Sequence, residues 1–205
     1  MTRPAFLFDL GGVLIEWDPR RVYRPYFPGP QELERFFAEV CTSEWNRSLD
    51  AGRSMAEAVR EKQAEFPQLA EPIGWWHSRW AEILGGPMPG SVEVLRELVE
   101  AGHPVCALTN WSAETFPIAR ARFPFLAWFA QIVVSGEVGL TKPDPAIFRL
   151  AVQRCGLDPA NTLFIDDHAP NIATAQTLGF ATHLFRDAER LRLDLIERGL
   201  LGPRP

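Results

Sequence analysis

Three aspartates of this sequence stand where short apolar runs end. Asp9 follows the run Ala5–Phe8, and the pair Asp166-Asp167 follows Leu163–Ile165. If these runs are neighbouring parallel strands, the three carboxylates meet at the edge where open α/β sheets bind ligands. Clustered carboxylates repel one another unless a cation neutralises them, and oxygen donors without histidine or cysteine suit Mg²⁺. The sequence therefore predicts a magnesium site.

Two further groups complete the chemistry of phosphoryl transfer. Thr109 and Asn110 follow the apolar run Val105–Leu108, and Lys142 lies in a later loop. A carboxylate nucleophile, a metal, a hydroxyl donor and an ammonium group together can hold a phosphoryl group in line and neutralise its charge. Of the 21 basic residues only Lys62 and Lys142 are lysine, and a compact point charge is the reason to keep lysine in such a chain. We expect Lys142 to supply that charge.

The glycine pair Gly11-Gly12, which begins two residues after Asp9, has two interpretations. Glycine allows a backbone to approach a ligand closely, and it equally allows a plain tight turn. Both interpretations are open from the sequence.

The apolar runs that position these groups are typical of strands buried on both faces. They are continuous rather than alternating, and they cover Ala5–Phe8, Val105–Leu108, Ile132–Val134, Leu163–Ile165 and Ala181–Phe185. Segments with helical spacing or helix start and stop signals separate the later runs: Val92–Ala101, Asp144 to Cys155, Ala169–Leu178 and Ala188–Arg198. Strands that alternate with helices predict an α/β fold with a doubly wound parallel sheet.

The first interval of the chain is too long for one crossover. From Asp9 to Thr109 the chain runs 100 residues, whereas one strand–helix–strand unit needs about 30. The surplus is large enough for a small domain. We predict a Rossmann-like core over residues 1–16 and 88–205, with an inserted helical domain over residues 17–87.

Within the predicted inserted domain, residues 17–87, local signals favour helices. Gln31–Cys41 follows a proline, and Ser54-Met-Ala-Glu57 forms a capping box before Ala58–Phe66. The aromatic-rich tract Trp75–Leu84 also has helical character, and the glycine- and proline-rich residues 85–90 predict a boundary.

Composition limits the classes of protein and partner. A chain of 205 residues with 46% hydrophobic and 23% charged residues is globular, which excludes disorder, collagen and coiled coil. The net charge of −5 argues against nucleic acid or an anionic membrane as the main partner. No apolar stretch is long enough to span a membrane, and Asp9 interrupts the early apolar run, so we expect a soluble cytoplasmic protein. We interpret the three widely spaced cysteines, Cys41, Cys106 and Cys155, as free thiols.

Taken together, four segments of the sequence resemble the four motifs of the haloacid dehalogenase superfamily. The segments read FDLGGVL from Phe8, LTNWS from Leu108, GLTKPD from Gly139 and FIDDHAPN from Phe164. Their order and spacing match that family across essentially the whole chain. The resemblance implies a Rossmann-like core with strand order 5-4-1-2-3 and a helical cap inserted directly after the first motif.

The resemblance also implies a role for each motif residue. Asp9 would be the nucleophile that forms an aspartyl-phosphate, and Lys142 would neutralise the nucleophile and the phosphate together. Thr109 and the backbone amide of Asn110 would hold the phosphoryl oxygens, and Asn171 would orient the lysine or the phosphate.

The same resemblance implies a ligand set for Mg²⁺ and exposes one departure from the family. The ligands would be Asp9, the backbone carbonyl of Gly11, Asp166 and Asp167, with one of the aspartate pair able to bind through water. Most phosphatases of the family have a second aspartate two residues after the nucleophile, where it is the general acid and base. Gly11 keeps the carbonyl ligand and lacks that proton donor, as in a sugar-phosphate phosphatase branch that the sequence resembles. The replacement donors that stay open are Glu16, His168 and a residue of the cap.

The sequence thus predicts a Mg²⁺-dependent hydrolase that acts on small, sugar-like phosphate monoesters. One alternative is a binding or regulatory module that kept the metal site and lost turnover at Gly11. A second alternative is a 2-haloacid dehalogenase, which uses the same nucleophile on carbon. That branch usually has neutral residues in the fourth motif, so Asp166 and Asp167 count against it. The sequence specifies neither the individual substrate nor the oligomeric state.

Overall fold

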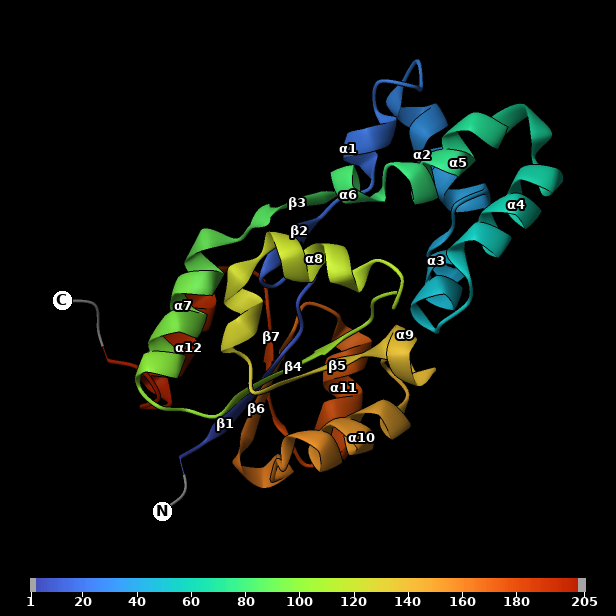
Figure 1. Ribbon diagram of the computed structural model, residues 1–205. Coiled ribbons are helices and arrows are strands. Elements are labelled where there is room, and N and C mark those ends of the chain that lie inside the picture. Colours follow the sequence, from blue (N-terminus) through green and yellow to red (C-terminus); the bar gives the residue numbers. More distant parts are fainter. Residues whose placement is uncertain (1–2, 203–205) are drawn as a thin grey trace.

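A five-stranded parallel sheet forms the centre of the structure, a computed structural model that describes residues 3–202. Its strands are β1 (Ala5–Phe8), β4 (Val105–Thr109), β5 (Gln131–Val134), β6 (Thr162–Asp166) and β7 (Ala181–Leu184). They are ordered β5-β4-β1-β6-β7, and each neighbouring pair is parallel (Figure 1). The predicted α/β class with a Rossmann-like parallel sheet is confirmed.

These strand numbers differ from the order 5-4-1-2-3 because strands β2 and β3 lie outside the sheet. When the five strands alone are counted along the chain and read from the β7 edge, the order becomes 5-4-1-2-3. The central strand β1 pairs with β4 on one side and β6 on the other. Residues at the carboxyl ends of these three strands are therefore neighbours.

Helices cover both faces of the sheet because its strands present apolar side chains to both. On one face, Phe8 shares a hydrophobic cluster with Leu95 and Leu191. On the other face, Leu7 clusters with Phe148. The covering helices are α7 (Pro89–Glu100), α8 (Phe116–Arg122) and α12 (Ala188–Glu197) on the first face, and α10 (Pro145–Cys155) and α11 (Ala169–Thr177) on the second. Each fully buried leucine or phenylalanine contributes roughly 1.5–3 kcal/mol, so these two layers hold the strand ends in place.

Local signals set the helix ends largely as the sequence predicts. Helix α10 begins after Asp144, whose carboxylate accepts a hydrogen bond from the backbone N–H of Ala146 at 2.8 Å. Helices α11 and α12 end within one residue of the predicted positions. Helix α7 begins at Pro89, three residues before the predicted start, because proline suits the first helical position. Three short helical segments, α9 (Ser135–Val138), η2 (Pro124–Trp128) and η3 (Pro159–Asn161), complete the core.

A helical insertion leaves and rejoins the core through an antiparallel ribbon of two short strands, β2 (Ile15–Trp17) and β3 (Leu84–Pro87). Between them lie α1 (Arg20–Tyr23), α2 (Pro30–Glu39), α3 (Ser43–Asp50), α4 (Met55–Glu65), η1 (Pro67–Leu69), α5 (Ala70–Ser78) and α6 (Trp80–Ile83). Figure 1 shows these helices grouped beyond the ribbon, to one side of the sheet. We call α1–α6 the helical insertion.

The structure adds detail to two expectations for this segment. The tract Trp75–Leu84 is helical, as predicted, up to Ile83: α5 covers its start, the chain breaks at Arg79 (φ −118°, ψ 19°), α6 follows, and Leu84 begins β3. The residues predicted as a boundary, 85–90, are largely strand β3, through which the insertion rejoins the core, and the start of α7. Pairing with β2 holds this glycine-rich stretch as a strand, and such long-range pairing leaves no local sequence signal.

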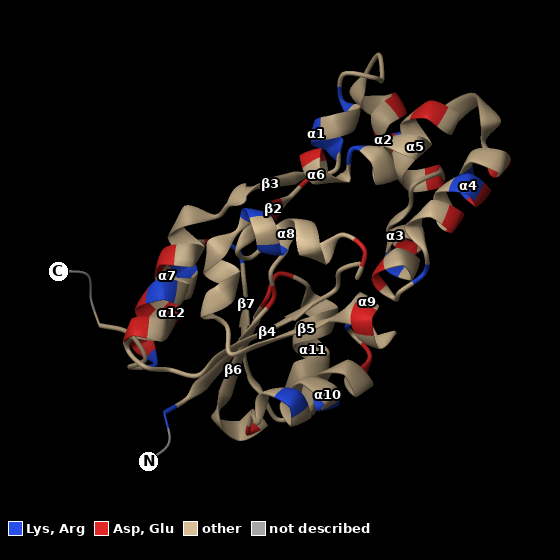
Figure 2. Cartoon of the chain, in the orientation of Figure 1, with Lys and Arg blue, Asp and Glu red and all other residues tan. Residues whose placement is uncertain are grey.

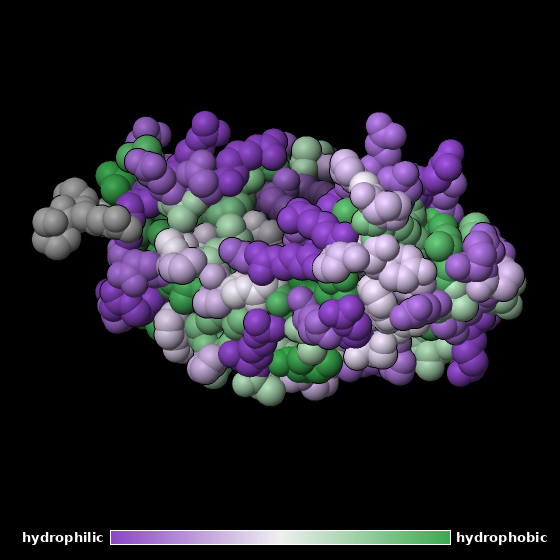
Figure 3. Space-filling view, turned by 90° about the horizontal axis from the view of Figure 1, so that it is seen from above, coloured by the Kyte–Doolittle hydropathy of each residue, from purple (hydrophilic) through white to green (hydrophobic). Residues whose placement is uncertain are grey.

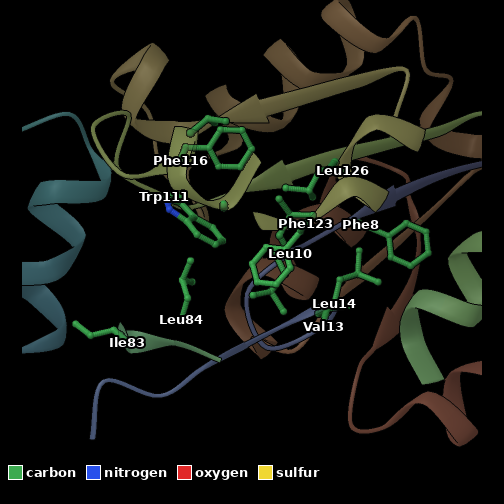
Figure 4. Close-up of a cluster of buried hydrophobic side chains, with 14 of the residues drawn as sticks. Phe8, Leu10, Val13, Leu14, Ile83, Leu84, Trp111, Phe116, Phe123 and Leu126 are labelled. Carbon is green, nitrogen blue, oxygen red and sulfur yellow. The ribbon is translucent and has the colours of Figure 1, made fainter. Parts of the chain in front are cut away.

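A continuous apolar cluster joins the return of the insertion to the core (Figure 4). Leu10 and Leu14, from the loop after β1, lie between the parallel sheet and Leu84 at the start of β3. Trp111 and Phe116 enclose the same cluster from the segment after β4. The loop that carries Gly11 and Gly12 is thus fixed from beneath by buried side chains.

Charge is concentrated away from the sheet. Figure 2 shows charged residues along helices such as α4, α7 and α12, whereas the strands of the sheet are almost uncharged. Asp166 is the single charged residue within the five sheet strands. Seen from above, the surface is mainly hydrophilic, with hydrophobic residues in smaller areas between (Figure 3). In the described part of the chain, each helix is too short or too polar to cross a bilayer.

Candidate active site

Three predicted site residues meet at the carboxyl edge of the sheet. Asp9 directly follows β1, Thr109 ends β4 and Asp166 ends β6. All three are buried, and the backbone N–H of Asp9 donates to the carbonyl of Ile165 at 2.8 Å, which fixes Asp9 beside Asp166. The topology therefore brings together residues that are up to 157 positions apart in the chain.

Lys142 lies between two carboxylates. Its Nζ is 2.9 Å from Oδ2 of Asp9 and 2.7 Å from Oδ2 of Asp166, and its side chain is 1% exposed. Asn110 fixes the lysine backbone from the loop after β4: its Oδ1 accepts from the N–H of Lys142 at 2.8 Å, and its Nδ2 donates to the carbonyl at 2.9 Å. The side chain of Asn110 thus positions the lysine, a role that the sequence did not predict.

Asn171 holds the carboxylate of Asp166 rather than the lysine. Its Nδ2 donates to both Oδ1 and Oδ2 of Asp166 at 3.0 Å, and the backbone N–H of His168 donates to Oδ1 at 2.8 Å. With Lys142 these contacts fix the orientation of Asp166 completely. Asn171 therefore orients the lysine only through the carboxylate that the two share.

One carboxylate oxygen from each of Asp9, Asp166 and Asp167 lies within 4.8 Å of the others. When all are ionised, the three carboxylates and the single ammonium of Lys142 leave an excess of two negative charges. An all-oxygen donor set with that excess fits a hard divalent cation such as Mg²⁺. The residues present at this edge are therefore chemically suited to the metal that the sequence predicts.

The pKa values of these groups reflect burial and crowding. Burial raises the pKa of Asp9 to about 7, although the ammonium of Lys142 works in the opposite direction. Burial also raises the pKa of Asp167, and the neighbouring carboxylate of Asp166 adds to that effect. For Lys142, burial alone would lower the pKa, but the carboxylates of Asp9 and Asp166 raise it above its ordinary value. The lysine is charged at neutral pH, and the carboxylates need a further positive charge to ionise together.

The two glycines after Asp9 have different reasons to be glycine. Gly12 has φ +75°, and a Cβ there would lie 2.5 Å from Oδ2 of Asp167. Gly12 thus lies in a tight turn, and this turn also approaches the acidic cluster closely. Gly11 lies outside the left-handed region, and its Cβ would meet only the Cβ of Trp17 at 3.9 Å. A side chain at position 11 is sterically permitted.

A cavity of about 660 Å³ opens above this edge, between the core and the helical insertion. Asp9, Thr109 and Lys142 line it from the core. Trp17 of β2 also lines it, and the helical insertion contributes aromatic and polar side chains, among them Arg20, Phe37, Thr42, Ser43, Asn46, Arg47, Asp50, Trp76 and Trp80. Trp76 and Trp80 are also buried, so each has a packing role as well as a position in the cavity wall.

Sequence reasoning missed the polar residues of α3 in this wall. Asn46, Arg47 and Asp50 belong to a short helix whose buried side chains are only Trp45 and Leu49. Such a sparse apolar pattern gives a weak helical signal. The detectable signal was local: Thr42 caps the helix by accepting from the N–H of Trp45 at 3.1 Å.

Two phosphatases and a magnesium complex are among the known proteins that this chain resembles. Hexitol phosphatase A of Escherichia coli is 29% identical over 213 residues, which cover 98% of this chain and 93% of that protein. Sesquiterpene phosphatase astK of Aspergillus oryzae is 27% identical over 184 residues, with 87% of both chains covered. A magnesium complex of a haloacid dehalogenase family enzyme from Bacteroides thetaiotaomicron has the same fold, with a TM-score of 0.71, 23% identity and coverage of 91% and 95%.

Other relatives are much longer than this chain. It spans 17% of mouse acyl-CoA dehydrogenase family member 10, at 26% identity, and 38% of the drimenol cyclase drtB of Aspergillus calidoustus, at 27% identity. The haloacid dehalogenase-like hydrolase family matches residues 4–179, so the resemblance of the four motifs is confirmed. This protein belongs to the haloacid dehalogenase-like hydrolases.

Proposed function

We propose that this hydrolase is a Mg²⁺-dependent phosphatase that acts on small phosphate monoesters through an aspartyl-phosphate on Asp9. The observation that carries the proposal is the placement of Asp9 at the floor of the cavity, 2.9 Å from Lys142 and inside the three-carboxylate cluster. A phosphoryl group bound there would meet a nucleophile, a fixed positive charge and a hydroxyl donor, Thr109, at once. The two phosphatases among its relatives support the same reaction class.

In the first step, a carboxylate oxygen of Asp9 attacks phosphorus and the bond to the leaving oxygen breaks. Leu10 fixes the nucleophile, because its backbone N–H donates to Oδ1 of Asp9 at 2.7 Å. Lys142 lowers the energy of the crowded anionic state, and Thr109 and the backbone amide of Asn110 hold the phosphoryl oxygens.

The residues that would hold Mg²⁺ are Asp9, Asp166 and Asp167, with the carbonyl of Gly11. The ion supplies charge neutralisation for the phosphoryl oxygens and the carboxylates. Because Asp166 already accepts hydrogen bonds from Asn171, His168 and Lys142, its orientation is fixed in advance of metal binding. In the second step water attacks the phosphorus, the bond to Asp9 breaks and inorganic phosphate leaves.

We further propose that residues 17–87 are a cap that selects the substrate, on a core formed by residues 1–16 and 88–205. The helical insertion supplies the wall of the cavity opposite Asp9. Hydrogen-bonding side chains on and before α3, such as Thr42 and Asn46, and the faces of Trp76 and Trp80 are suited to a hydroxylated, sugar-like leaving group.

The two alternatives predict other outcomes. A 2-haloacid dehalogenase has no use for a charged cluster that binds a cation, so Asp166 and Asp167 disfavour it. A module without turnover would still bind Mg²⁺ and phosphate.

The experiment is phosphate release by the purified full chain from a panel of metabolite phosphates, with millimolar Mg²⁺ or with EDTA. We expect turnover that requires Mg²⁺ and that falls at least about 10³-fold in Asp9→Asn, a nearly isosteric change. Absence of turnover on every substrate of the panel would favour the binding module over the phosphatase. Chloride release from 2-chloropropionate would establish the dehalogenase. Residual activity of Asp9→Asn within about tenfold of wild type would remove Asp9 from the nucleophile role.

A further inference from the structure

The loop after β1 provides no proton donor, yet alkoxide leaving groups need one. A general acid contributes roughly 10²–10⁴-fold in such reactions. Glu16 is unsuitable, because it does not line the cavity and its half-exposed carboxylate pairs with Arg21 at 2.5 Å. His168 lines the cavity, but it is exposed and lies on the core side, next to Asp167.

On the opposite wall, Asp50 is the single acidic side chain among the described residues that the helical insertion contributes to the cavity. It ends helix α3, which lies against α9 and the loop after β4 (Figure 1). Asp50 therefore faces the same space as Asp9, from the side where a leaving group would be enclosed.

Several contacts fix Asp50 in this position. Its carboxylate accepts from the backbone N–H of Ser112, three residues after Thr109, and from Nδ2 of Asn46 at 3.1 Å. Its carbonyl accepts from Oγ of Ser135 at 2.6 Å. Gly52 allows this approach, because it has φ +98° and a Cβ there would be 3.1 Å from the carbonyl oxygen of Gly136.

The surroundings of Asp50 favour exchange of a proton near neutral pH. Burial raises the pKa of Asp50 to about 7, partly offset by the N–H of Ser112 and the guanidinium of Arg47. Arg47 is the charged side chain that acts on it directly, and the other charged or titratable groups that line the cavity are Arg20, Asp9, Lys142, Asp167 and His168. A carboxyl group of this kind can be protonated before the first step and ionised after it.

We propose that Asp50 is the general acid and base of the phosphatase reaction, and so replaces the aspartate that position 11 lacks; the inference rests on the proposed function. When Asp9 attacks phosphorus, the leaving oxygen takes the proton of the Asp50 carboxyl and departs as an alcohol. The Asp50 carboxylate then removes a proton from water as the water oxygen attacks phosphorus and the bond to Asp9 breaks. Inorganic phosphate leaves, and Asp50 is protonated again.

The test compares single-turnover rates of wild type and Asp50→Asn on two substrates. One is p-nitrophenyl phosphate, whose leaving group needs no proton, and the other is the alkyl phosphate that wild type hydrolyses fastest. Asp50→Asn should slow the first turnover of the alkyl ester by roughly 10²–10⁴-fold and that of the p-nitrophenyl ester by less than about tenfold. The p-nitrophenyl ester should then show a burst, because the second step also loses its base.

Two further variants complete the design. Glu44→Gln removes an exposed carboxylate from the same helix and should leave both rates unchanged. Gly11→Asp in the Asp50→Asn background should restore alkyl-ester turnover by at least about tenfold, because position 11 has room for a side chain.

Equal losses on both substrates would assign Asp50 a structural role and overturn the inference. A substrate-selective loss in His168→Gln instead of Asp50→Asn would also overturn it. The wild-type rate on the panel separately decides the proposed function, so the two failures are distinguishable.

Discussion

The backbone of Gly12 lies so close to Asp167 that a Cβ on the glycine would be 2.5 Å from Oδ2 of the carboxylate. Gly12 also adopts φ +75°, which L side chains rarely do. The loop after the nucleophile and the loop after β6 are thereby held in contact without an intervening side chain. Any substituent at position 12 must displace a carboxylate of the acidic cluster.

Gly12→Ala should therefore weaken Mg²⁺ binding by at least about tenfold and lower stability by about 1–3 kcal/mol. The matched control is Gly11→Ala, because a Cβ there meets nothing closer than 3.9 Å. Isothermal titration with Mg²⁺ and urea denaturation measure the two effects. If both alanine variants bind Mg²⁺ like wild type, the contact between Gly12 and Asp167 does not shape the metal site.

Lys142 should be essential to stability as well as to catalysis. Lys142→Met leaves the buried carboxylates of Asp9 and Asp166 without their shared partner, and breaking a buried pair costs about 3–5 kcal/mol. Lys62 provides the control, since its partner Glu65 is exposed and such pairs contribute less than about 1 kcal/mol. The comparison is the free energy of unfolding of Lys142→Met and Lys62→Met in urea without metal. Similar values for the two variants would contradict the buried ion pairs.

Metal binding should stabilise the folded protein. Because the three carboxylates are brought together only by folding, Mg²⁺ at 100 times its Kd should add about 2.7 kcal/mol and raise the Tm, and EDTA should reverse the effect. Asp167→Asn should reduce this shift. Asp158→Asn, which alters an exposed cap of η3, should retain it. A Tm indifferent to Mg²⁺ and EDTA would exclude the proposed site.

Asp50 should make stability depend on pH in a specific direction. Its pKa of about 7 in the folded state exceeds the value of about 3.9 in an unfolded chain, so the folded state binds more protons between these two pH values. The contribution of this carboxyl to stability is therefore present below about pH 4 and is lost as the pH rises through about 7. Asp50→Asn removes the loss, so its stability relative to wild type should increase from pH 4 to pH 8 by on the order of 1–3 kcal/mol. The measurement is the free energy of unfolding of wild type and Asp50→Asn in urea from pH 4 to pH 8. A difference between the two proteins that stays constant over this range would refute the raised pKa.

The parallel sheet and the residues at its carboxyl edge can be predicted from local patterns in the sequence. Continuous apolar runs such as Ala5–Phe8 are sufficient to mark buried strands, and the helix signals at Asp144 and Pro145 are local interactions between near neighbours. Asp9 directly follows β1 and Asp166 ends β6, so the alignment of the two strand ends alone brings these residues together. These features depend on interactions within a few residues or on one repeating pattern.

The way in which the insertion meets this edge depends on contacts between distant parts of the chain. Strand β3 contains two glycines and exists because β2 pairs with it, and that pairing joins residues about 70 positions apart. The sequence predicted a role for the backbone amide of Asn110 only, whereas the hydrogen bonds of its side chain to the backbone of Lys142 depend on two loops meeting. Asp50 has an unremarkable local sequence, and its burial beside Ser112 and Ser135 results from α3 docking on the loops after β4 and β5. Contacts between distant segments determine how deeply these side chains are buried and which charged groups lie near them. No local pattern in the sequence encodes such contacts.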